Sequence, residues 1–331
     1  MRFARTTEQQ DVAETLRALL DAAGTAEIAR AWARGDPEPW RAVWARLAGM
    51  GACGVVVPEH QGGQGLGAVE LAVCLEELGY AGLPGPVVES LAAVPALLAD
   101  AGQPWPAELA AGRVVASVAF PGPVPLALDA TAADVVFRCA DGVAVVARPT
   151  GEPERSLDPT RALRAVAPAG PPIPGARVAA AFDAGVLGCA AQLLGIGRRL
   201  LDLALRHVRE RHQFGRPIGS FQAVKHALAD VALRLEFARP LVRGACLALD
   251  SGAEHADRDV SVAKTASAEA ARLAARTALQ VHGAIGYTAE HDLHLWLLKA
   301  AALNSAWGND RFHRHRIAAA LAAGRTAPIG P

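Results

Sequence analysis

The chain has 331 residues, of which 52% are hydrophobic and 20% charged, so it can bury a large core and is not a disordered protein. Lysine plus arginine equals aspartate plus glutamate at 33 each, so no overall charge attracts nucleic acid or an anionic membrane. The five cysteines are scattered singly, which argues against a disulfide framework or a structural zinc site. The N-terminus lacks the apolar core of a signal peptide, and no run of about eighteen uncharged apolar residues follows. We therefore expect a cytoplasmic location, no membrane segment and no metal.

Residues 1–112 are predicted to form a helical domain. The stretches "DVAETLRALLDAA" and "EPWRAVWARLAGMG" carry apolar residues at helical spacing. A further helix is predicted from Ala68 to Leu78, with Gly79 as its end. The preceding "GGQGLG", residues 62–67, imitates a dinucleotide-binding motif but has no βαβ unit around it, so we interpret it as a tight loop between helices.

Residues 113–178 are predicted to form a small β-domain, because short β-branched runs alternate with Pro-Gly and Asp141-Gly142 turn signals. Residues 179–331 are predicted to form an antiparallel four-helix bundle. Its helical segments are expected at 185–211, 220–249, 257–282 and 290–323, with a break near Gly308 in the last and a kink at Pro240 in the second. The fold class is therefore mainly α with a small β-domain.

The stretch "RERHQFGRPIGSFQAVKH", Arg209 to His226, indicates a local anion site. The guanidinium of Arg211 offers rigid paired donors to a phosphate, the Gln213 amide adds a neutral donor, and the Phe214 ring can cover a flat heteroaromatic ring. The alternative is a solvated helix end, where basic side chains complement the negative end of the helix dipole.

The stretch "QVHGAIGYTAEHDLHLW", Gln280 to Trp296, is the second candidate site. Gly283 and Gly286 let backbone amides approach a ligand, and Gln280 precedes them by one turn; an ordinary glycine helix cap is the alternative. The sequence also suggests a metal site, but its three histidines have no supporting Cys or Glu-x-x-His pattern, so we expect core or surface histidines instead; they are His282, His291 and His294.

Together these stretches resemble the acyl-CoA dehydrogenase family. "RERHQFGRPIGSFQAVKHALADV" resembles the family's second signature, and "ALQVHGAIGYTAEHDLHL" resembles its Gln-x-x-Gly-Gly-x-Gly-Tyr stretch, with Ala284 in place of the second glycine. "LAGMGACGVVVPEHQGGQGLGAVELAVCLEELG" is similar to the N-terminal helical domain, and "SLDPTRALRAV" to the last segment of the β-domain. The resemblance implies an N-terminal helical domain, a middle β-domain and a C-terminal four-helix bundle, usually assembled as a tetramer.

The resemblance implies FAD as the cofactor and dehydrogenation of an acyl-CoA thioester between its α- and β-carbons. In proteins of this family, the arginine of Arg-x-x-Phe-Gly reaches across a subunit interface to the FAD pyrophosphate. The resemblance places the residues matching Gln213 and Phe214 beside it and Gln222 nearby, and the second stretch matches the family's other adenosine-diphosphate contacts. The implied FAD contacts are Arg211, Gln213, Phe214, Gln222, Gln280, Gly283 and Gly286.

The catalytic base that the resemblance implies is missing. The family's usual glutamate position holds Trp307, and the alternative position at the start of the first bundle helix holds Gly185. Neither residue can take the α-proton. Glu290 and Asp310 are candidate replacements, although Glu290 also matches a structural acid of the family and Asp310 can simply cap the last helix.

The middle domain lacks segments like Thr-Glu-Pro…Gly-Ser-Asp and Trp-Ile-Thr-Asn, which in the family line the isoalloxazine ring and the thioester. In this respect the chain resembles the smaller subunit of heterotetrameric steroid side-chain acyl-CoA dehydrogenases. We therefore expect it to complete the FAD site of a full-length homologous partner. Two alternatives remain: a self-sufficient homotetrameric dehydrogenase with a relocated base, and a structural subunit without catalytic function.

Overall fold

Short helices from the first third of the chain pack around Trp40, Trp44 and Leu47, which are buried. The computed structural model describes residues 4–288 and 290–324. Thr6 caps the first helix by accepting the N–H of Gln9. The elements are α1 (Thr7–Ala23), α2 (Thr25–Ala33), α3 (Glu38–Gly49), η1 (Ala52–Gly54), η2 (Glu59–Gln61), α4 (Ala68–Ala81), the π-helical η3 (Glu89–Ala93), α5 (Val94–Leu98) and α6 (Trp105–Ala110).

Helix α4 continues past the point where the sequence predicts its end. Gly79 lies inside the helix, and Gly82, with φ +70°, follows its last residue, so the predicted end at Gly79 is wrong. A Cβ on Gly79 would lie 2.3 Å from the carbonyl oxygen of Gln192 in α7 (Val178–Glu210). The glycine is therefore needed because the two helices approach closely there, not because the chain turns.

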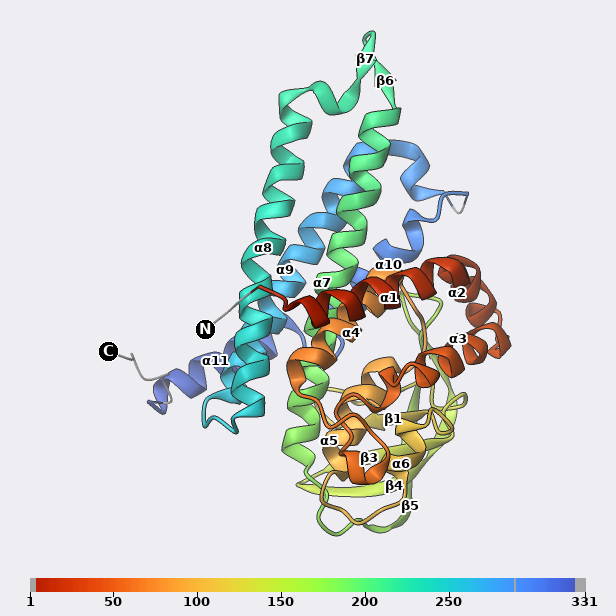
Figure 1. Cartoon of the computed structure of the whole chain (residues 1–331), viewed down its shortest axis with the longest axis vertical. Coiled ribbons are helices and arrows are strands. Elements are labelled where there is room, and N and C mark those ends of the chain that lie inside the picture. Colours follow the sequence, from red (N-terminus) through yellow and green to blue (C-terminus); the bar gives the residue numbers. More distant parts are fainter. Residues whose placement is uncertain (1–3, 289, 325–331) are drawn as a thin grey trace.

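Five strands form the small β-domain between the helical parts (Figure 1). They are β1 (Ala116–Ala119), β2 (Ala127–Leu128), β3 (Val135–Ala140), β4 (Val143–Arg155) and β5 (Ala162–Pro172), in the sheet order β1-β3-β4-β5-β2. Strand β3 pairs parallel with β1 and antiparallel with β4. Asp141 and Gly142, with φ of +51° and +77°, make the predicted hairpin turn between β3 and β4.

Long helices α7, α8 (Gln222–Asp250) and α9 (Ala256–His282) form the C-terminal bundle with α10 (Leu293–Ser305) and α11 (Asp310–Ala322). Between α7 and α8 the chain makes a hairpin, β6 (His212–Gln213) and β7 (Arg216–Pro217), and the turn η4 (Ile218–Ser220). The turn η5 (Gly283–Tyr287) follows α9. Figure 1 shows the hairpin projecting beyond the end of the bundle, away from the β-domain.

The bundle helices begin at other residues than the sequence predicts. Helix α7 starts at Val178 instead of Gly185, because the alanines after it favour helix and the Arg177 carbonyl accepts the N–H of Ala181. Ser220 belongs to the turn η4 and Glu290 to the turn before α10, so both lie outside the helices. The break near Gly308 is confirmed, and Pro240 lies inside α8.

The fold class is as predicted: helices, a small sheet and a helical bundle follow one another along the chain. We propose 1–112, 113–178 and 179–331 as the domain boundaries. Helix α7 is long and apolar enough to cross a membrane by length and composition alone, but 83% of its most apolar window is buried inside the protein. It is thus the core helix around which the bundle and the N-terminal helices pack.

A buried ion pair joins the β-domain to the bundle. The Lys299 ammonium on α10 donates to Asp158 Oδ2 at 3.0 Å and to Thr160 Oγ1 at 2.8 Å, in the loop between β4 and β5. The Thr160 hydroxyl donates in turn to Asp158 Oδ1. All three side chains are buried, so each polar group needs these partners.

Asp158→Asn is expected to lower the free energy of unfolding by about 3 kcal/mol, because it leaves the buried Lys299 ammonium without a countercharge. The measurement is urea unfolding. Asp310→Asn is the matched control, since Asp310 pairs with Arg314 on the surface and an exposed pair contributes about 0–1 kcal/mol. Equal losses in the two variants would show that the buried pair does not hold the domains together.

Candidate functional site

The hairpin after α7 carries the first group of predicted contact residues into solvent. Arg211 is the residue after α7; its N–H donates to the His207 carbonyl, and its own carbonyl accepts the N–H of Ile218, both at 2.8 Å. Phe214 sits at the tip with φ +52° and is 92% exposed. The side chains of the predicted set on this hairpin and at the start of α8 are all exposed; they are Arg211, Gln213, Phe214 and Gln222.

The second group lies at the same end of the bundle. Gln280 is exposed on the last turn of α9, and Gly283, with φ +62°, starts the turn η5. The rings of His207 on α7 and His282 on α9 stack with centroids 4.1 Å apart, which brings the two predicted segments together. Gly286 is buried, and a Cβ on it would lie 3.2 Å from the Cβ of His282. Only small residues fit where this turn packs on the helix.

Positive charge is concentrated at this end of the chain's bundle, although the whole chain is neutral. Residues 206–216 contain four arginines and one glutamate, namely Arg206, Arg209, Arg211, Arg216 and Glu210. The Arg216 guanidinium lies over the Phe221 ring at 4.2 Å. Arg211 makes no ion pair with any residue that the structure describes. Its guanidinium is therefore free to meet an external anion.

The two positions where the family's base is expected face each other. Trp307, between α10 and α11, is 2% exposed and has φ +58°. A Cβ on Gly185 would lie 2.1 Å from Cζ3 of the indole, so the ring occupies the space above that glycine. Phe120 and Phe182 enclose the ring, with centroids 5.6 and 6.1 Å from that of Trp307. Aromatic side chains thus fill the space between the two predicted base positions.

The candidate replacement bases do not reach this place. Asp310 is exposed on α11 and pairs with Arg314 at 2.8 Å. The cap that the sequence assigns to Asp310 is made by Asn309, whose side chain accepts the N–H of Phe312 at 2.9 Å. Glu290 is exposed in the turn before α10. Neither residue lines the cavity that contains Trp307.

A buried carboxyl that the sequence reasoning missed does line this cavity. The cavity has a volume of about 340 Å³ and lies between α10 and the loop before β2, with Glu89, Arg161 and Trp307 in its wall. Burial raises the pKa of Glu89 to about 7, and the nearby Arg161 opposes that shift. The only signal in the sequence is one charged residue inside the apolar run 87–94.

The histidines near η5 bond to the protein itself. His282 Nδ1 lies 2.7 Å from the Ala278 carbonyl, and His294 Nδ1 lies 2.8 Å from that of His291. Within residues 4–288 and 290–324, no group of three or more potential ligands is arranged to hold a metal ion.

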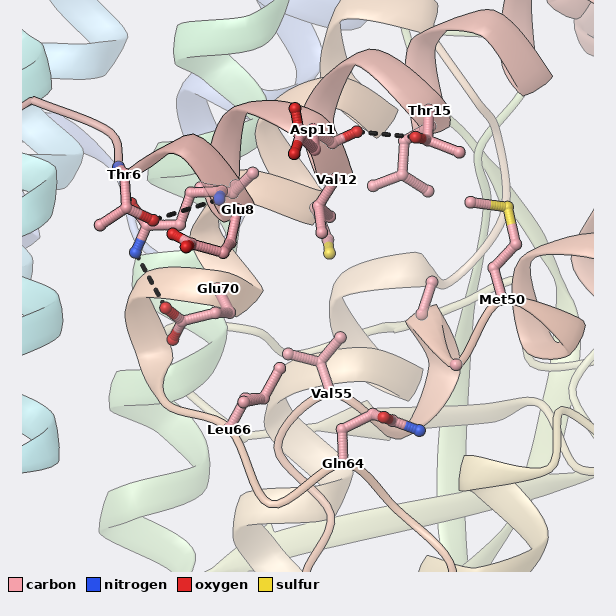
Figure 2. A pocket seen from close by; sticks show the side chains of 16 residues that line it. Thr6, Glu8, Asp11, Val12, Thr15, Met50, Val55, Gln64, Leu66 and Glu70 are labelled. Atoms are coloured by element: carbon pink, nitrogen blue, oxygen red, sulfur yellow. Dashed lines mark hydrogen bonds between the residues drawn. The ribbon is translucent and has the colours of Figure 1, made fainter.

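A separate groove of about 580 Å³ lies in the N-terminal domain, between α1 and the segment that leads into α4. Figure 2 shows Val12, Met50 and Leu66 around it. The Gln9 amide on α1 donates to Glu70 Oε1 on α4 at 2.9 Å. None of the predicted FAD contacts or base positions lines this groove. It is therefore distinct from the site at the end of the bundle.

Comparisons with known proteins identify the family to which the N- and C-terminal parts of the chain are similar. Residues 6–104 match the description "Acyl-CoA dehydrogenase, N-terminal domain" and residues 175–322 match "Acyl-CoA dehydrogenase, C-terminal domain". Acyl-CoA dehydrogenase IpdE2 of Mycolicibacterium smegmatis is 34% identical over 94% of this chain and 98% of its own length. The ChsE4-ChsE5 complex from Mycobacterium tuberculosis is similar in structure, with a TM-score of 0.82, 25% identity, and coverage of 97% of this chain and 99% of that chain.

PigA, solved with FAD and proline, shares the fold, with a TM-score of 0.82, 21% identity, and coverage of 97% of this chain and 99% of that chain. The predicted cofactor is confirmed at the level of the family, which is FAD-dependent. Both domain matches, and a relative aligned over almost its whole length, show that this chain belongs to the acyl-CoA dehydrogenase family.

Proposed function

We propose that this chain is a subunit of an FAD-dependent acyl-CoA dehydrogenase and completes the FAD site of a larger homologous partner. One observation carries the proposal. Arg211 presents a guanidinium at an exposed hairpin without an ion pair among the described residues, whereas buried Trp307 packs on Gly185, and these are the two positions where the sequence resemblance implies a base. The chain would thus offer part of an FAD site to a neighbouring subunit, while its own predicted base positions hold no carboxylate.

The residues at the end of the bundle suit the diphosphate part of FAD. Arg211 offers a charged fork of donors, and the exposed amides of Gln213 and Gln280 offer neutral ones. The exposed ring of Phe214 can cover the flat part of a nucleotide. The hairpin β6–β7 lies at the end of the bundle that is remote from the chain's own β-domain (Figure 1). A bound FAD would therefore extend toward another subunit.

An apolar stripe on α8 supports association with another chain. Leu233, Phe237 and Leu241 follow one another at intervals of four residues on one helix face and are 55%, 69% and 39% exposed. Large exposed apolar side chains in a row mark a protein interface. The homologous bundle of a full-length subunit would cover them, and the similar structure from Mycobacterium tuberculosis is a complex of ChsE4 and ChsE5.

Bound FAD would supply the acceptor for the hydride that leaves the β-carbon of the acyl-CoA thioester. Arg211 neutralises the diphosphate and so fixes the cofactor's position relative to the partner's substrate cleft. We assign the α-proton to a carboxylate of the partner subunit, because Trp307 and Gly185 occupy the two base positions that the resemblance implies. We infer a substrate of the steroid side-chain class from the sequence resemblance, and a cytoplasmic location agrees with five free, buried cysteines.

One observation favours the self-sufficient alternative. Glu89 lies in the wall of the cavity beside Trp307, and burial raises its pKa to about 7, the range that suits a general base at neutral pH. If Glu89 served as a relocated base, Glu89→Gln would abolish dye reduction by the isolated chain. The paired enzyme should keep its activity in this variant.

The test is expression of the chain alone and together with a full-length acyl-CoA dehydrogenase homologue from the same organism. We expect a colourless protein alone, and a yellow complex that reduces a dye with acyl-CoA once the partner is present. A yellow, active preparation of the chain alone would support the self-sufficient alternative. A complex whose flavin content is indifferent to Arg211 would support a purely structural subunit.

A further inference from the structure

We propose that His207 and His282 are positioning residues that join the Arg211 hairpin and the turn η5 into one FAD-contacting unit. The inference deepens the proposed function and rests on it. The two segments are separated by more than sixty residues of sequence, and each is anchored to a different helix. FAD requires both at once, so something must fix their separation before the cofactor arrives.

The stacked rings are placed to do this. His207 lies on the last turn of α7, and its carbonyl accepts the N–H of Arg211 at 2.8 Å. His282 is the last residue of α9, directly before Gly283. Their rings are 4.1 Å apart with an interplanar angle of 23°. A displacement of either helix end would therefore separate the rings.

The turn η5 closes over the same histidine. A Cβ on Gly286 would lie 3.2 Å from the Cβ of His282, which shows how tightly the turn packs on it. The ring of His291, in the turn after η5, also contacts the His282 ring edge-on, with centroids 5.0 Å apart. His282 thus contacts one ring from α7 and one from the chain that follows η5.

Hydrogen bonds orient the rings of His282 and His291. His282 Nδ1 lies 2.7 Å from the Ala278 carbonyl, so this nitrogen carries the proton and donates. His291 Nδ1 accepts the N–H of Leu293 at 3.1 Å, so it carries none. Neutral imidazoles attract one another in a stack, whereas two cations at this distance would repel.

Protonation at low pH should therefore weaken the stack of His207 on His282 that joins the Arg211 hairpin to η5. Burial lowers the pKa of His282 to about 4, and burial, His291 and Arg211 lower the pKa of His207, with Glu210 acting in the opposite direction. Because the pKa of His282 in the folded protein lies below the ordinary value of 6.5, its stabilising effect is complete above that value. The effect is lost as the pH falls from 6.5 toward 4.

The test measures FAD affinity in the complex with the full-length partner, by the fluorescence of released flavin, for His207→Ala and His207→Phe. We expect His207→Ala to weaken FAD binding about three- to tenfold, through loss of the ring stack. His207→Phe keeps a flat ring and should restore the affinity. It should also make FAD retention less sensitive to acid, because one of the two imidazoles is gone. His255→Ala, before the start of α9 at the other end of the bundle, is the control.

Unchanged affinity in His207→Ala, beside clear FAD release in Arg211→Ala, would overturn this inference and leave the proposed function intact. A loss in His207→Phe as large as in His207→Ala would also overturn it, because the stacked ring would then not be what matters. Retention of FAD by Arg211→Ala would overturn the proposed function as well.

Discussion

Arg211→Ala is expected to release FAD from the assembled dehydrogenase while leaving the chain folded. The guanidinium stands on an exposed hairpin and makes no ion pair within the described part of the chain, so its removal breaks no salt bridge there. A charge-assisted hydrogen bond to a phosphate contributes about 1.5–3 kcal/mol, which corresponds to roughly ten- to a hundredfold weaker binding of FAD. The measurement is the ratio of flavin to protein after gel filtration of the complex.

Two further variants separate the role of this side chain from general charge effects. Arg211→Lys keeps the charge but loses the paired donors, so FAD retention should fall between those of the wild type and Arg211→Ala. Arg148→Ala removes an exposed arginine from β4, in the β-domain, and should leave FAD bound. FAD loss of the same size in Arg148→Ala and Arg211→Ala would contradict a specific contact with the diphosphate.

Gly185→Ala is expected to destabilise the protein strongly, although alanine favours helix more than glycine does. The new Cβ would lie 2.1 Å from Cζ3 of Trp307, inside a closed aromatic cluster. Overpacking of this kind costs about 1–3 kcal/mol, and the fully buried indole has little room to move. Trp307→Ala should cost about 3–5 kcal/mol through the cavity it leaves. Urea unfolding measures both changes.

The double variant tests whether the two residues act on each other. Once Trp307→Ala has removed the indole, Gly185→Ala meets no obstacle and should be neutral, or stabilising by up to about 1 kcal/mol through helix propensity. The coupling energy should therefore be large and favourable. If Gly185→Ala costs the same in both backgrounds, the indole does not fill the base position, and the reason for assigning the proton transfer to a partner falls away.

Much of the fold was predictable from local patterns. Apolar periodicity placed the bundle helices, and Asp141-Gly142 marked the β3–β4 turn, because both features depend on neighbours in sequence. Gly79 shows the limit of this reasoning. A glycine near a helix end indicates a cap, but this one is required by the carbonyl of Gln192, more than a hundred residues away.

The candidate site also has features that the sequence predicts and features that only the folded structure shows. The motifs that carry Arg211 and Gln280 were visible as sequence, and the structure brings their segments to one end of the bundle. Trp307 and Gly185 were each recognised as lacking a carboxylate, but their contact is a property of packing between distant segments. Glu89 could not be predicted as a site residue, because only the fold shows that this buried acid lines the same cavity as Trp307.

The number of flavins in the purified heteromeric complex tests most directly whether this chain completes the FAD site of a partner and binds no FAD by itself. We expect one FAD for each pair of unlike chains, with none bound when this chain is purified by itself. A full complement of FAD on this chain alone, or two FAD molecules for each pair, would mean that its own cleft holds flavin in spite of the indole at position 307, and would contradict the account.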